Sequence, residues 1–338
     1  MARTYLRLML AVAGLFARLD ARCLNQVAAL YPNERTIAAD IAVLVFEAPA
    51  AAVQDAINEG YPALPEKPKL LPLPSSLNVP RDKHLVIVTT GINNDIRQKT
   101  LVDLMIDGSL RQSSVIVPYT TTGRSSTPLS APLVAYIAGA DPSKNPALAG
   151  AIPALVATAT GGLLSLIGVF IPQNLPYQLD GTGTDGRQLY SSGTKWSLIP
   201  NPVSGPGVVP QAFDVNFSPE AAPKYPLLEL KKMLNFPYIL NAPYNLVPLV
   251  GIQQCQRNTY FTNFDTAQVQ NISGRVTFGS AGEGPGVILD GTLQKASPNG
   301  IYTGAHGFLA CTQLVGYSPA IGEGCETAAR NVDPNSLL

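Results

Sequence analysis

The sequence predicts an α+β protein with a helical arm over residues 1–60, a proline-rich connector over 61–82 and a mainly antiparallel β body over 83–338. Three observations predict this order. Apolar residues recur at helical spacing in the first sixty residues. Six prolines lie between Tyr61 and Pro80, which is typical of an extended connector. From residue 188 onward, short apolar runs alternate with Gly, Pro, Asn and Ser clusters, as in a sandwich or barrel.

The first 23 residues predict a basic amphipathic helix. At 100° per residue, one arc of about 100° holds four arginines, and the apolar side chains lie opposite. The arginines are Arg3, Arg7, Arg18 and Arg22, and Phe16 belongs to the apolar side. This pattern fits a transit peptide, an interfacial membrane helix, or a helix docked on its own protein or a neighbour. The last use needs the fewest assumptions, and all five residues are candidate contacts for assembly or a membrane.

Two further helices complete the predicted arm. One begins at Asn33 as N-cap and runs to Phe46, and the next has Pro49 in its first turn and ends at Gly60. After the connector, a strand over residues 85–90, a helix ending at Gly108 and a strand over 113–122 resemble one βαβ unit.

The turn over residues 89–94 of that unit is a candidate anion site. A helix N-terminus that follows a strand offers free N–H groups to a phosphate. The turn lacks the glycine spacings of dinucleotide-binding and P-loop motifs. Asn94 capping its own helix explains the same residues without a ligand.

Residues 145–179 form an apolar segment without a charged side chain. The run from Ala147 to Ile171 is long enough to cross a bilayer, but Pro153 and the Gly161-Gly162 pair interrupt it. Burial in the protein or against another subunit is the favoured interpretation, and lipid contact is the alternative. The candidate contact residues here are Leu155, Leu164, Ile167 and Phe170.

No motif predicts catalysis, a cofactor or a metal. The chain has two histidines, which excludes a His-rich metal site, and Ser318 lies in only half of a nucleophile-elbow pattern. Asp180 and Asp185 lie in a glycine-rich run that does not follow the EF-hand pattern. The four cysteines follow no metal-ligand spacing. Cys311 and Cys325 are close enough to form a disulfide, and buried free thiols are the alternative.

The composition favours a subunit of a larger assembly. Charged residues make up 14% of the chain, and 23 Lys and Arg balance 23 Asp and Glu. No overall field attracts nucleic acid, and a weakly charged surface resists association poorly. We therefore predict a non-enzymatic structural protein, of a virion shell or extracellular appendage, whose partners are copies of itself or other subunits.

Two alternatives remain open at this stage. One is a membrane-associated component, with the basic N-terminal helix in the headgroups and residues 147–171 inserted. The other is an enzyme with an anion site at residues 89–94. The sequence does not determine localisation; a virion or extracellular assembly is favoured, and association with a membrane is the alternative.

Overall fold

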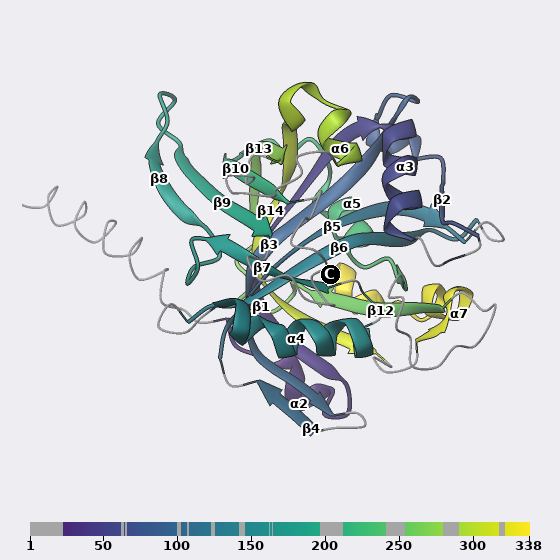
Figure 1. Cartoon of the computed structure of the whole chain (residues 1–338), viewed down its shortest axis with the longest axis vertical. Helices are drawn as coiled ribbons and strands as arrows, with labels where there is room; N and C mark the ends of the chain where they lie inside the picture. The colour runs from purple at the N-terminus through teal and green to yellow at the C-terminus, as the bar shows by residue number, and fades with distance from the viewer. Residues whose placement is uncertain are drawn as a thin grey trace, which may run out of the picture.

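The computed structural model describes residues 23–61, 64, 66–99, 103–106, 108–122, 126–141, 146–161, 163, 165–196, 212–240, 254–279, 291–317 and 322–338 (Figure 1). Within these ranges the chain is mainly β. The longer strands are β1 (Arg35–Pro49), β3 (Lys83–Lys99), β5 (Leu110–Thr121), β6 (Leu129–Gly139), β7 (Ser165–Ile171), β9 (Gln188–Trp196), β10 (Phe213–Pro219), β12 (Gln254–Phe261), β13 (Gln270–Phe278) and β14 (Ile301–Tyr317).

The remaining elements are short. The short strands are β2 (Lys69–Leu70), β4 (Asp103–Ile106), β8 (Gln178–Thr182), β11 (Tyr238–Ile239) and β15 (Glu323–Gly324). The helices are α2 (Val27–Leu30), α3 (Ala50–Gly60), α4 (Pro146–Gly161), α5 (Leu227–Leu234), α6 (Thr292–Lys295) and α7 (Cys325–Arg330), with 3₁₀ turns η1 (Ser75–Leu77), η2 (Pro298–Gly300) and η3 (Pro334–Leu337).

Nine strands close into a barrel in the order β6–β7–β9–β10–β13–β14–β1–β3–β5, with β5 paired to β6. A second, smaller ring shares five of these strands. On the other side of the wall β14–β1–β3–β5–β6, β12 pairs with β14, and β11 pairs with both β12 and β6. The shared wall therefore has an enclosed interior on each of its faces.

Burial of the wall on both faces explains its sequence. Side chains alternate between the faces of a strand, so a strand covered on both sides reads as a continuous apolar run. In β1, Leu44 and Phe46 face the nine-stranded interior, where they pack with residues of β10 and β13. Val43 and Val45 face the smaller ring, where they belong to the cluster that includes α5.

The predicted helical arm is wrong. Residues 35–49 form β1, which pairs with β14 on one side and β3 on the other. The apolar residues between Ile37 and Phe46 fit both a helical and a strand pattern. Hydrogen bonding along both edges shows that the segment is a strand. Of the two later helices predicted there, only α3 is present. The predicted helix over residues 1–23 lies almost wholly outside the described residues, which begin at Cys23.

The predicted βαβ unit is also wrong, because β3 continues as one strand through residues 83–99. The turn proposed over residues 89–94 is therefore part of a strand. The actual βαβ unit is β6–α4–β7, whose two strands are parallel. The helix and second strand of this unit, α4 and β7, lie in the uncharged segment, and most residues of β7 are buried. Among the described residues, no helix is long and apolar enough to cross a membrane.

The proline-rich connector lies against the barrel. Leu77 is buried, and Leu71, Leu73 and Val79 pack partly against the cluster in the smaller ring. Lys69 and Leu70 form β2, which pairs with β5. The prolines thus give an extended chain that borders the sheet as an edge, where missing N–H groups cost no ladder bond.

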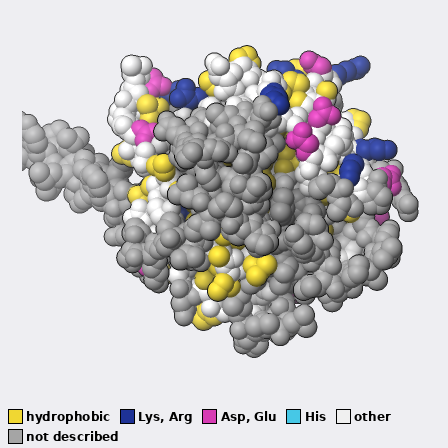
Figure 2. Space-filling model, viewed as in Figure 1, with side chains coloured by type: hydrophobic (Ala, Val, Ile, Leu, Met, Phe, Trp, Pro, Cys, Tyr) yellow, Lys and Arg dark blue, Asp and Glu magenta, His cyan; other side chains and the backbone are white. Residues whose placement is uncertain are grey.

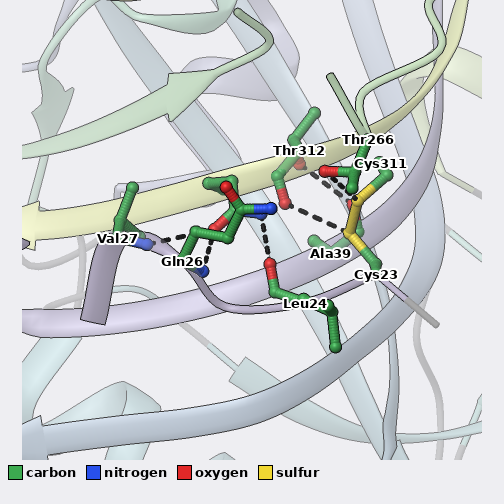
Figure 3. The surroundings of a disulfide bond; sticks show 9 residues. Cys23, Leu24, Gln26, Val27, Ala39, Thr266, Cys311 and Thr312 are labelled. Carbon is green, nitrogen blue, oxygen red and sulfur yellow. Dashed lines mark hydrogen bonds between the residues drawn. A yellow bond between two sulfur atoms is a disulfide. The ribbon is translucent and has the colours of Figure 1, made fainter. Parts of the chain in front are cut away.

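The cysteines pair differently from the sequence prediction. Cys23 bonds to Cys311 and Cys255 bonds to Cys325, so the predicted disulfide between Cys311 and Cys325 is wrong. Cys311 lies on β14, whereas Cys325 begins α7. Figure 3 shows Cys23 against β14. The backbone N–H groups of Gln26 and Val27 donate to Oε1 of Gln313, which belongs to β14. This bond joins positions 288 residues apart and fixes the first described residues to the barrel.

Candidate functional site

The smaller ring encloses a cavity of about 110 Å³. Its walls come from the shared strands, from β4, β7, β11 and β12, and from α4. The lining is mostly apolar at the α4 side, where Ile96, Ile106, Leu110 and Ile137 meet Ala157. The polar residues that line it are Arg35, Thr89, Asn93, Gln98, Gln112, Ser114, Ser165, Tyr238, Asn258 and Tyr260.

Arg35 is the one charged side chain among the described lining residues. It begins β1, opposite Gly316 of β14, which in turn is opposite Asn258 of β12. The guanidinium reaches across the glycine, and Nη2 donates to Asn258 Oδ1 at 2.6 Å. A Cβ at Gly316 would lie 2.6 Å from the same Nη2, so only a glycine leaves this space free.

The charge of Arg35 is not balanced within the part of the chain that is described. There, no carboxylate oxygen lies within 4.0 Å of its guanidinium. Its Nε is buried without a hydrogen-bond partner. Burial lowers the pKa of Arg35, and the neighbouring Tyr260 and Tyr238 raise it. A desolvated cation with neutral neighbours is costly, and an anion bound beside it offsets that cost.

Two phenols lie beside the guanidinium. Burial raises the pKa of Tyr238 well above its ordinary value, and Tyr260 raises it further, whereas Arg35 lowers it. Burial also raises the pKa of Tyr260. Both phenols therefore stay protonated at neutral pH and can donate a hydrogen bond. The backbone of Tyr260 is fixed by Asn235, whose Oδ1 accepts from the Tyr260 N–H at 2.7 Å.

The other polar groups of the wall satisfy one another. Thr89 Oγ1 and Ser114 Oγ lie 2.7 Å apart, and Asn93 Nδ2 donates to Gln112 Oε1. These pairs join adjacent strands β3 and β5. They are uncharged and mutually bonded, so the unbalanced charge of the cavity is concentrated at Arg35.

Arg111, on the opposite face of the wall, is a structural arginine. Its Nε, like that of Arg35, is buried without a hydrogen-bond partner, and the difference lies in the acceptors of its two terminal nitrogens and in the nearby Asp40. It is completely buried, and Nη1 donates to the carbonyls of Gly91 and Pro176 at 3.0 and 2.8 Å. Nη2 donates to Ser192 Oγ at 2.8 Å. Burial lowers the pKa of Arg111 to about 9, and Asp40 raises it. Burial raises the pKa of Asp40 to about 6, and Arg111 lowers it. Both of its terminal nitrogens are used within the fold.

The predicted contact residues are distributed unevenly. Leu155 is 53% exposed on α4, whereas Ile167 and Phe170 are buried in β7. The ring of Phe170 lies 4.9 Å from the guanidinium carbon of Arg111, so this side chain belongs to the interior. Leu164 and the N-terminal candidates Arg3, Arg7, Phe16, Arg18 and Arg22 lie outside the described residues.

Sequence reasoning placed two of the cavity residues near an anion site for the wrong reason. Thr89 and Asn93 line the cavity, but from the middle of a strand and without free N–H groups. Arg35, Tyr238 and Tyr260 were missed. Arg35 lies about 200 residues before the two tyrosines, and the pairing of β1 with β14, β14 with β12 and β12 with β11 brings all three together.

Comparison with known proteins gives matches at the level of fold only. No family model matches the chain, and no curated protein matches it. Among solved structures, the chain is similar to the enduracididine biosynthesis enzyme MppR, with 8% identity, coverage of 88% of this chain and 91% of that one, and a TM-score of 0.45. It is also similar to an acetoacetate decarboxylase-like enzyme from Sphingomonas wittichii RW1, with 9% identity, 86% and 91% coverage, and a TM-score of 0.47.

The structure removes the basis of the predicted non-enzymatic structural subunit of a virion shell or appendage. The helical arm on which that prediction depended is not present over residues 35–49. The prediction of a β-rich chain was correct. The low charge of the chain, attributed above to a weakly charged surface, also reflects a wall of strands that is buried on both faces.

Proposed function

We propose that this chain is an enzyme that acts on a small organic anion held in the cavity of the smaller ring. The observation that carries the proposal is Arg35, a guanidinium without a carboxylate partner among the described residues, next to two protonated phenols. This corresponds to the third function predicted from sequence, with the anion site moved from a loop to the start of β1.

The chemistry of the lining favours a carboxylate. A guanidinium presents parallel N–H groups that match the two oxygens of a carboxylate. Tyr238 and Tyr260 would donate hydrogen bonds to a second oxygen of the substrate, and such donors stabilise negative charge that develops there during reaction. The apolar residues at the α4 side would hold the hydrocarbon part. For scale, an engineered protein cavity of about 150 Å³ binds benzene, so a cavity of about 110 Å³ suits a ligand no larger than one ring.

A set of short carboxylic acids and their neutral amides tests this proposal. The purified chain is incubated with each compound in D₂O, and ¹H NMR follows line broadening, deuterium incorporation and product signals. We expect at least one acid to bind and react, and its amide to bind at least tenfold more weakly because it carries no charge for Arg35. Equal binding of acids and amides, or no binding of either at millimolar concentration, would reject the anion site.

A further inference from the structure

One wall of the cavity is built differently from the others. Every described lining residue lies on a strand except Pro153 and Ala157 of α4 and Leu163 of the following turn. A ligand that entered between strands would have to break ladder hydrogen bonds. Displacing part of α4 breaks none of the ladder, so this helix is the least costly way into the cavity.

The first half of α4 is fixed to the barrel. A Cβ at Gly150 would lie 2.7 Å from Ala138 Cα and 2.8 Å from the Ile137 carbonyl oxygen. A Cβ at Gly139 would lie 2.4 Å from Ala149 Cβ. This approach of helix and β6 is possible only because both positions are glycine. The beginning of α4 is therefore held tightly against β6.

The second half is held less firmly. Pro153 has no N–H, so the helix lacks the hydrogen bond to the Ala149 carbonyl at this point, and such positions allow a helix to bend. Beyond it, the described side chains of α4 that pack on the barrel are small: Ala154 is buried and Ala157 is partly buried. Leu155 is exposed, and Figure 2 shows hydrophobic side chains on the surface where α4 lies. Alanines bury little apolar surface, so the contacts of Ala154 and Ala157 hold this half closed only weakly.

We propose that residues 154–161 of α4 form a lid that pivots at Pro153 and opens the cavity to solvent. The lid controls access to the cavity, and only the identity of the ligand that enters rests on the proposed function. A lid of this kind needs an open state populated at about 0.1–10%, which is the ordinary range for a minor conformation. The fixed half, from Pro146 to Ile152, stays in place during opening.

Thiol labelling measures the opening without any substrate. All four cysteines are in disulfides, so Ser114→Cys, inside the cavity, introduces a single thiol. Its rate of reaction with methyl methanethiosulfonate reports how often the cavity opens. Adding Pro153→Ala restores the missing N–H and stiffens the helix, and we expect labelling to slow about tenfold. Leu155→Ala, on the outer face of the same helix, is the matched control and should leave the rate within about twofold.

Hydrogen exchange gives a second measurement that does not depend on the introduced cysteine. In the native chain, the amides of residues 154–161 should exchange at least tenfold faster than those of 150–152, and Pro153→Ala should reduce the difference. Equal exchange in the two halves, or labelling that Pro153→Ala does not slow, would overturn the lid. Failure of every acid to bind would reject the proposed function and leave both of these measurements valid.

Discussion

Replacing Arg35 with methionine separates a binding role from a structural one. The variant keeps a long unbranched side chain and removes the charge. A hydrogen bond to a charged group contributes about 1.5–3 kcal/mol, so the affinity for a short carboxylate should fall roughly 10- to 150-fold. The neutral amide of the same acid should be almost unaffected, because it does not use the charge.

The stability of the empty protein should change little. Loss of the guanidinium leaves Asn258 Oδ1 without its donor at 2.6 Å, which costs about 1–3 kcal/mol. Removal of a desolvated charge without an acidic partner gains a similar amount. The two effects oppose each other, so the free energy of unfolding should stay within about 1 kcal/mol of the native value and the midpoint of thermal unfolding within about 3 °C.

Thermal unfolding with and without the acid, at constant ionic strength, measures both effects together. Bound ligand raises the midpoint according to its affinity, so the increase should disappear in Arg35→Met. Arg275→Met is the matched control, because Arg275 also donates to an asparagine, Asn216 at 3.2 Å, but on the surface. If Arg35→Met lowered the midpoint by more than about 8 °C and kept the shift caused by the acid, Arg35 would be a structural residue and the reasoning would be refuted.

Three further variants test separate parts of the structure. Gly316→Ala places a methyl where the guanidinium of Arg35 lies and should weaken acid binding about tenfold by titration calorimetry, with unchanged circular dichroism; unchanged affinity would show that the guanidinium position is unimportant. Asp40 has a folded pKa of about 6, above its ordinary 3.8, so it stabilises the fold most below pH 4 and this contribution is lost as the pH rises through 6. In urea titrations, Asp40→Asn should remove about 2 kcal/mol of the stability difference between pH 4 and pH 8, and an identical pH profile would contradict the raised pKa. Cys23→Ser opens a disulfide that spans 288 residues and should cost about 2–4 kcal/mol; reductant should then have less effect on the variant than on the native chain, and an equal effect would show that this bond adds no stability.

The wall strand β1 shows why local pattern misled at the start of the chain. Its central residues are apolar in an unbroken run, because Leu44 and Val45 face different interiors. An unbroken run does not distinguish a helix from a doubly buried strand. What makes this segment a strand is its hydrogen bonding to β3 along one edge and to β14 along the other.

The uncharged segment shows a partial success. Its lack of charge predicted burial in protein, and Ile167 and Phe170 are buried. Pro153 and the Gly161-Gly162 pair predicted an interrupted element. The helix α4 continues through Pro153 and ends at Gly161, and β7 begins at Ser165, so the prediction is wrong for Pro153. The exposed Leu155 was included among contact residues, and its role in assembly stays a prediction.

By itself, the sequence determined composition and local preference: a weakly charged, β-rich chain with a proline-rich stretch, turns at glycines and an uncharged apolar segment over residues 145–179. These follow from properties of neighbouring residues. Only the tertiary structure decided that β1 is a strand, which cysteines pair, and that Arg35 meets Asn258 across Gly316. Those outcomes depend on contacts between distant parts of the chain: β1 and β14 pair residues about 260–280 positions apart, β12 and β14 pair residues about 50–60 apart, and Cys23 and Cys311 are separated by 288. No local pattern specifies which distant strand will pair with which.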